Sequence, residues 1–151
     1  MDQLEKSSSK FGGHPDDCRT ANYIIRGTDV DPEEITRLTG IEPDESWRTG
    51  DQLPISRRPA RDSLWRIESG LADSDEFHRH IAALLVKMRP SWGAFVEFGK
   101  RYSPYIDVSI HLHEAQGPLV ALLPDIMREL SGLNVELYFD LYAMTRRHRG
   151  R

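Results

Sequence analysis

Two segments of the chain alternate strictly between apolar and polar side chains. Residues 106–113 carry aliphatic side chains at even positions and Asp, Ser or His at odd positions, and residues 135–142 carry aliphatic or aromatic side chains at odd positions. A period of two predicts strands with one buried face and one wetter face. A doubly wound parallel sheet, which is covered on both faces, has near-continuous apolar strands instead. The alternation therefore favours an α+β fold with helices on one face of the sheet.

The remaining elements follow from periodicity and from helix start and stop signals. Asp31 can cap a helix whose first position is Pro32, and Gly40 fits the left-handed position at its end. Residues 92–102 fit both periods, and the capping potential of Ser91 favours a helix there. The expected order, β-α-β-α-(α)-β-α-β, has strands at 20–27, 63–68, 106–113 and 135–142 and helices near 32–39, 77–88, 92–102 and 123–132. We expect a four- or five-stranded mixed or antiparallel sheet whose other face is partly open or covered by a long loop.

Charge is uneven along the 151 residues, a length that suits one domain. Residues 20–145, the expected domain, hold 13 basic and 20 acidic side chains, whereas residues 146–151 form a basic C-terminal tail with four arginines. Residues 1–19 are rich in Ser and Gly and lack periodicity, which predicts a flexible tail. Without a long apolar segment or a signal-peptide core, the chain is expected to be cytoplasmic and not to enter a membrane.

Motifs of the common nucleotide-dependent and hydrolytic enzymes are absent from the sequence. Cys18 is the single cysteine, which excludes an internal disulfide and a Cys-rich zinc site. Asp16 and Asp17 beside it oppose thiolate formation. We therefore assign no catalytic residue and expect no cofactor. The acidic body makes nucleic acid an unlikely partner, although the basic tail could contact nucleic acid or an acidic membrane surface, or serve only solubility.

The segment 42–66 combines arginines with tryptophans and has no usable period. A connection this long in a small domain is usually functional or mobile. Guanidinium groups bind phosphate and carboxylate bidentately and stack on aromatic rings. The candidate binding residues are Trp47, Arg48, Asp51, Arg57, Arg58 and Arg61, of which Asp51 could instead cap a turn or order an arginine. The alternative is a solvated loop in which Trp47 and Trp65 fill the core.

Two pairs of histidines differ in what their spacing allows. His111 and His113 lie two apart on a predicted strand, so their side chains should point to the same side, about 6.5–7 Å apart. Imidazoles and nearby acids such as Asp107 suit zinc, so an enzyme or a metal- or ligand-binding site here is the alternative to a solvated sheet face. His78 and His80 lie on a predicted helix, where about 200° separates them, so they are expected to be surface or boundary residues.

The wetter face of the sheet is a further candidate surface. Tyrosines among charged groups are typical of recognition surfaces, although a half-wetted sheet looks similar. The strand pattern predicts that this face brings together Arg26, Arg66, Glu68, Asp107, His111, His113, Glu136, Tyr138, Asp140 and Tyr142. Tyr138 and Asp140 join the loop residues as candidate binding residues.

Several motifs together resemble a known family. They are YIIRGTDVDPEEITRLTGIEP at 23–43, Trp47, Gly50-Asp51, Leu64-Trp65 and VELYFDLY at 135–142. Over about residues 20–143 the chain resembles the bacterial family called domain of unknown function 4279. The resemblance implies bacterial origin and one folded unit, assigns no activity and no site residue, and suggests a toxin-binding immunity protein. We therefore expect a small immunity-like or accessory binding module with a basic, toxin-like protein partner.

Overall fold

The structure, a computed structural model, describes residues 18–72, 76–113 and 120–144. Most of the predicted N-terminal tail and all of the basic C-terminal tail lie outside these residues. The strands are β1 (Cys18–Gly27), β2 (Glu45–Trp47), β3 (Ser63–Glu68), β4 (Tyr105–His113) and β5 (Glu136–Met144). The helices are α2 (Pro32–Thr39), α3 (Phe77–Met88), the short 3-10 helix η3 (Arg89–Ser91), α4 (Trp92–Arg101) and α5 (Pro124–Leu133).

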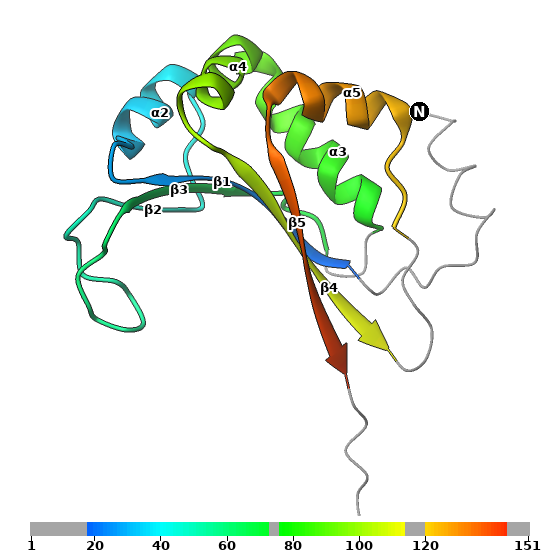
Figure 1. Ribbon diagram of the computed structural model, residues 1–151, viewed down its shortest axis with the longest axis horizontal. Helices are drawn as coiled ribbons and strands as arrows, with labels where there is room; N and C mark the ends of the chain where they lie inside the picture. Colours follow the sequence, from blue (N-terminus) through cyan, green and yellow to red (C-terminus); the bar gives the residue numbers. More distant parts are fainter. Residues whose placement is uncertain (1–17, 73–75, 114–119, 145–151) are drawn as a thin grey trace, which may run out of the picture.

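The five strands form one mixed sheet in the order β2-β3-β1-β4-β5. β1 is central and antiparallel to both β3 and β4, and β2 is antiparallel to β3. β4 and β5 are parallel. Helices α2, α3, α4 and α5 all lie on one side of this sheet (Figure 1). The predicted fold class, an α+β domain with helices on one face of a mixed sheet, is confirmed.

Local sequence signals account for the helix ends. Asp31 accepts hydrogen bonds from the N–H groups of Glu33 and Glu34, and Gly40 takes the left-handed conformation at φ 69° after α2, as predicted. α5 begins at Pro124 but continues past Gly132, the predicted end, and Asn134 takes the left-handed position at φ 51° instead. Asn tolerates this conformation better than most residues, so either position could have ended the helix.

The core lies between the helices and the inner face of the sheet. Tyr23 from β1, Trp65 from β3 and Phe95 from α4 are all fully buried at its centre. The Tyr23 ring meets Trp65 and Phe95 edge-on, with ring centroids 6.5 and 5.3 Å away. The Trp65 indole N–H donates to the Thr36 hydroxyl at 3.0 Å, which satisfies its polar atom and ties β3 to α2.

The prediction that His78 and His80 are surface or boundary residues is wrong. Both are buried on α3, with 7% and 0% of their surface exposed. His80 Nδ1 hydrogen bonds to the Ser69 hydroxyl at 2.7 Å, and His78 Nδ1 lies 3.3 Å from a carboxylate oxygen of Glu76. An imidazole can be buried when a partner satisfies it, and neither partner follows from the helical period.

Candidate recognition surface

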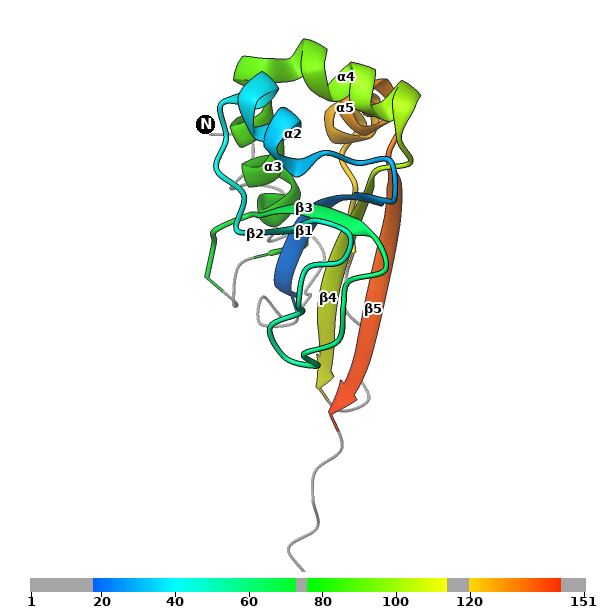
Figure 2. The ribbon, with the colours of Figure 1, turned by 90° about the vertical axis from the view of Figure 1, so that its left-hand side faces the viewer.

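The sheet face opposite the helices, here called the outer face, is not covered by any helix of the described chain (Figures 1 and 2). The strand register places alternate residues of all five strands on it. Asn22 pairs with both Glu68 and Asp107, and Asp107 pairs with Tyr138. The described side chains of this face are Thr20, Asn22, Ile24, Arg26, Glu45, Trp47, Leu64, Arg66, Glu68, Tyr105, Asp107, Ser109, His111, Glu136, Tyr138, Asp140 and Tyr142.

The two arginines of the outer face are paired within the fold. The Arg26 guanidinium donates to Asp62 at 2.8 Å. The Arg66 guanidinium donates to Glu68 at 2.6 Å and to the Asn22 side-chain oxygen at 3.1 Å, and it lies 3.5 Å from Glu45. Arg66 is therefore a cross-strand link between β1, β2 and β3 and leaves little charge for a ligand.

The β4–β5 half of the outer face has a different character. The carboxylates of Asp107, Glu136 and Asp140 have no ion pair with any Lys or Arg whose side chain the structure describes. Tyr138 and Tyr142 are each about half exposed, at 51%. The Tyr138 ring meets Tyr105 edge-on at 5.5 Å between centroids. This half is therefore an acidic, tyrosine-rich surface open to a partner.

The carboxyl groups of Asp107 and Asp140 lie next to each other on this surface. Burial raises the pKa of Asp107 to about 6, and the adjacent Asp140 adds a shared hydrogen bond and repulsion between the charged forms. One Asp107 oxygen is buried without a hydrogen-bond partner among the described residues. Nearby, the Tyr138 hydroxyl donates to Glu136, which raises the pKa of Tyr138 above its usual value. A cation arriving here would relieve the repulsion between the two aspartates.

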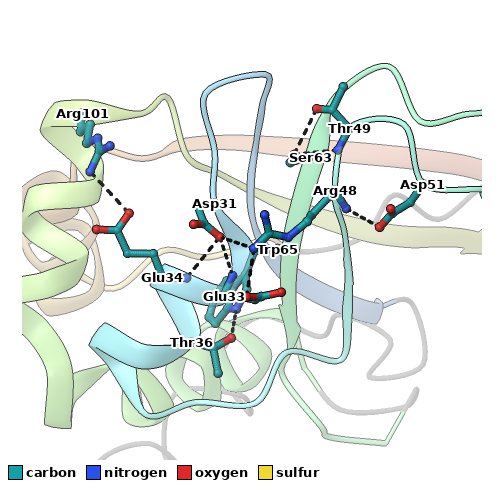
Figure 3. A network of polar contacts seen from close by, with 10 residues as sticks. All are labelled: Asp31, Glu33, Glu34, Thr36, Arg48, Thr49, Asp51, Ser63, Trp65 and Arg101. Atoms are coloured by element: carbon teal, nitrogen blue, oxygen red, sulfur yellow. Dashed lines mark hydrogen bonds and ion pairs between the residues drawn. The ribbon is translucent and has the colours of Figure 1, made fainter.

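The loop between β2 and β3, residues 48–62, begins on a tight polar network (Figure 3). The Arg48 guanidinium lies 3.2 Å from Asp31 and 3.0 Å from Glu33 at the start of α2. The Arg48 N–H donates to Asp51 at 2.8 Å, so Asp51 caps a turn, one of the two roles expected for it. Arg48 and Asp51 were predicted as binding residues. In the structure, the contacts of both residues hold the base of the loop.

The outer part of the 48–62 loop is an ordered hairpin. Gly50 N–H donates to the Ala60 carbonyl at 2.8 Å, and Leu53 N–H to the Arg58 carbonyl at 3.0 Å. Ile55 at the tip is 97% exposed, and Arg57 turns there with φ 55°. The exposed side chains of Arg57, Arg58 and Arg61 make no ion pair with the described residues. Of the predicted loop residues, these three are the ones still able to bind a partner.

Both tryptophans serve the fold, but only Trp65 fills the core, as the solvated-loop alternative expected of both. Trp65 is fully buried in the core. Trp47 is half-buried on β2, and its indole N–H donates to the Asp62 carbonyl at 3.1 Å. Trp47 therefore closes the base of the loop. The segment also holds β2, a strand that sequence periodicity did not indicate.

The structure describes the side chain of one histidine of the predicted pair on β4, that of His111. His111 lies on the outer face, as predicted, with its ring 5.2 Å from that of Tyr142. The side chain of His113 lies outside the described residues. Asp107 and His111 are four positions apart on one strand, about 13 Å between Cα atoms. Within the described parts of the chain, no three His, Cys, Asp or Glu side chains are grouped so that they could hold a metal ion.

Comparisons with known proteins assign the chain to a family without assigning an activity. None of the helices in the described residues is long and apolar enough to cross a membrane. No curated protein and no solved structure matches the chain significantly. One family model matches residues 17–144, and its span agrees with the predicted resemblance over about residues 20–143. The chain therefore belongs to the family described as Domain of unknown function (DUF4279).

Proposed function

We propose that this protein is a small protein-binding module, immunity-like or accessory, that recognises a partner by surface complementarity. The β4–β5 half of the outer face would meet a basic surface of that partner. The observation that carries the proposal is the group of three carboxylates, Asp107, Glu136 and Asp140. They lie among half-exposed tyrosines, and no Lys or Arg with a described side chain pairs with them. Aromatic side chains at the centre of a patch supply binding energy, and uncompensated charge supplies steering and specificity.

The tip of the 48–62 loop would supply a second contact of opposite sign. Arg57 and Arg58 are exposed there near Ile55, and Arg61 is exposed nearer the base of the loop. The loop projects from the side of the sheet opposite the helices (Figure 2). Because backbone hydrogen bonds order the hairpin, these arginines would be presented without a large cost in chain entropy. The partner would therefore carry a basic region that faces β4 and β5, and an acidic group within reach of the loop tip.

The test uses the intact chain as bait in a lysate of its source organism, with mass spectrometry of the captured proteins. The double variant Glu136→Lys/Asp140→Lys reverses charge on the outer face. A matched control, Glu97→Lys/Asp125→Lys, makes the same change of charge at helix positions whose side chains are 69% and 86% exposed. We expect a stoichiometric protein partner whose capture falls at least tenfold with the outer-face variant and changes little with the control.

A second arm of the experiment isolates the loop. Arg57→Glu/Arg58→Glu should weaken capture of the same partner, because the hairpin would then present negative charge to an acidic group. Capture that is equal for the outer-face variant and its control would refute the role of the sheet. Capture that is unaffected by the loop variant would restrict the interface to β4 and β5.

A further inference from the structure

β5 has a free edge, the edge away from β4, along which the described part of the chain places no other strand. Among the described residues, β5 pairs only with β4. The Glu136 N–H donates to the Pro104 carbonyl at 3.2 Å, on the β4 side. Because backbone groups alternate in direction along a strand, the even-numbered residues of β5 bond toward β4. Leu137, Phe139 and Leu141 therefore direct their N–H and C=O groups outward, toward the free edge.

This edge lacks most of the devices that usually protect a sheet edge from pairing. Such devices are shortness, charged side chains and especially Lys, Pro on the strand, and bulges. Of these, β5 has the two acids Glu136 and Asp140. The opposite edge strand, β2, is only three residues long. β5 has nine residues, ELYFDLYAM, with no Lys, Arg or Pro, and it pairs with β4 without a bulge. Four of its large side chains are substantially exposed: Tyr138 51%, Phe139 39%, Leu141 59% and Tyr142 51%.

We propose that a second copy of this chain pairs with this edge, antiparallel and two-fold symmetric, so that two five-stranded sheets become one continuous sheet. The symmetry axis would pass beside Phe139, so that Phe139 lies opposite its own counterpart. Leu137 then faces Leu141 of the second copy on the helix side of the sheet. On the outer face, Tyr138 faces Asp140 and Glu136 faces Tyr142 of the second copy.

The side chains of β5 match those of a second copy of β5 in this register, which favours a second copy as the occupant. Any two-fold pairing of β5 in which the outward-directed groups bond each other is centred on a single residue. Centring on Asp140 would place Asp140 against its counterpart, beside Asp107, and centring on Tyr138 would oppose Glu136 and Asp140. Like charges directly opposite each other destabilise a sheet. Centring on Phe139 instead gives both acids of β5 a tyrosine hydroxyl as cross-strand neighbour and pairs apolar side chains with apolar side chains.

Oligomeric state tests the proposal with the full chain and no other protein present. Sedimentation velocity over a hundredfold range of concentration should show a species of twice the 17.3 kDa chain mass. Leu141→Lys places a charge on the edge at a side chain that is 59% exposed, so the fold should tolerate it and the dimer should dissociate. Val86→Lys on α3, at a residue 58% exposed, is the matched control and should stay dimeric.

Cysteine cross-linking tests the register in a Cys18→Ser background. Tyr138 and Asp140 of the second copy would form a non-hydrogen-bonded pair, with Cα atoms about 4.5 Å apart, which suits a disulfide. The double variant Tyr138→Cys/Asp140→Cys should therefore cross-link under mild oxidation, whereas each single variant should not. Efficient cross-linking of Asp140→Cys alone or Tyr138→Cys alone would overturn the register.

Two further outcomes would overturn the dimer itself. One is a monomer at every concentration, which would leave the edge to another occupant or to none. The other is a dimer that Leu141→Lys does not dissociate, which would place the interface elsewhere. Because none of these measurements uses the partner of the proposed function, the dimer and that function can fail independently.

Discussion

At the scale of single residues, Asp107 is the group whose chemistry departs most from that of an ordinary surface carboxyl. Its pKa is raised to about 6 by burial and by Asp140, so the folded state favours the protonated form more than the unfolded chain does. A raised pKa of this kind contributes stability that is fully present below the unfolded-state value near 4 and is lost as pH rises through about 6. At neutral pH the two aspartates therefore oppose folding.

Asp107→Asn should stabilise the protein at neutral pH. The amide keeps the size of the side chain, removes one negative charge and can donate a hydrogen bond to Asp140. We expect the unfolding midpoint to rise by a few degrees at pH 7.5 and to change little at pH 4.5, measured by circular dichroism. The control Glu42→Gln, at an exposed position, should change neither midpoint. A gain of the same size at both pH values would show that the charge of Asp107 is not the cause.

Residue roles in the candidate surface were only partly predictable from the sequence. Alternation along the strands correctly placed Tyr138 and Asp140 on the wetter face, because the period of two is a local property. It could not show that Arg48 would be occupied at the base of the loop. That role depends on Asp31 and Glu33 at the start of α2, which the folded chain brings to the loop from elsewhere in the sequence. The turn cap by Asp51 is local and was one of the roles expected for it.

At the scale of elements, α4 and α5 pack so closely that one glycine has no room for a side chain. A Cβ at Gly99 would lie 2.1 Å from the Leu133 carbonyl oxygen and 3.2 Å from the Asn134 Cβ. The Asn134 amide donates to the Gly99 carbonyl at 2.8 Å across the same contact. The end of α4 and the left-handed turn after α5 are thus held together by backbone approach rather than by side-chain packing.

Gly99→Ala should force these helices apart and destabilise the fold by about 2 kcal/mol or more, as overpacking of a close contact does. Gly93 lies in the same helix, and no atom would lie within 4 Å of the Cβ that Gly93→Ala adds. This substitution should be neutral or stabilising by up to about 1 kcal/mol, the difference in helix propensity. Urea denaturation of both variants measures the contrast. Equal effects would mean that α5 yields to the methyl group without cost.

Elements differed in how far the sequence could specify them. The long periodic segments β4 and α3 could be predicted because many of their side chains follow a single period. β2 has only three residues, too few for a period, and its pairing with β3 depends on the 48–62 hairpin. The parallel pairing of β4 with β5 was likewise not predictable, since strand order is set by contacts between distant segments. The helical choice for residues 92–102 was correct, although Ser91 donates to the Thr39 carbonyl rather than capping α4.

At the scale of the whole molecule, the proposed boundaries separate a domain at residues 20–145 from two tails. The family match over 17–144 covers nearly the same span, with β1 beginning at Cys18. Removing residues 1–16 and 146–151 together should therefore shift the thermal unfolding midpoint by no more than a few degrees and leave the circular dichroism of the folded part unchanged. Loss of a cooperative transition in the shortened chain would show that a tail belongs to the fold.

The central position of β1 has a consequence for how the chain reaches this structure. β1 precedes every other element described, yet its two neighbours in the sheet are β3 and β4, and its partner residues on β4 lie far along the chain. Helices such as α2 can form locally, but the middle of the sheet closes only after β4 has been synthesised and has found β1. Closing so long a segment is slow compared with local structure formation. Until then the side of β1 that will pair with β4 offers unpaired backbone, even after β3 has paired with the other side, so the nascent chain exposes the centre of its future sheet.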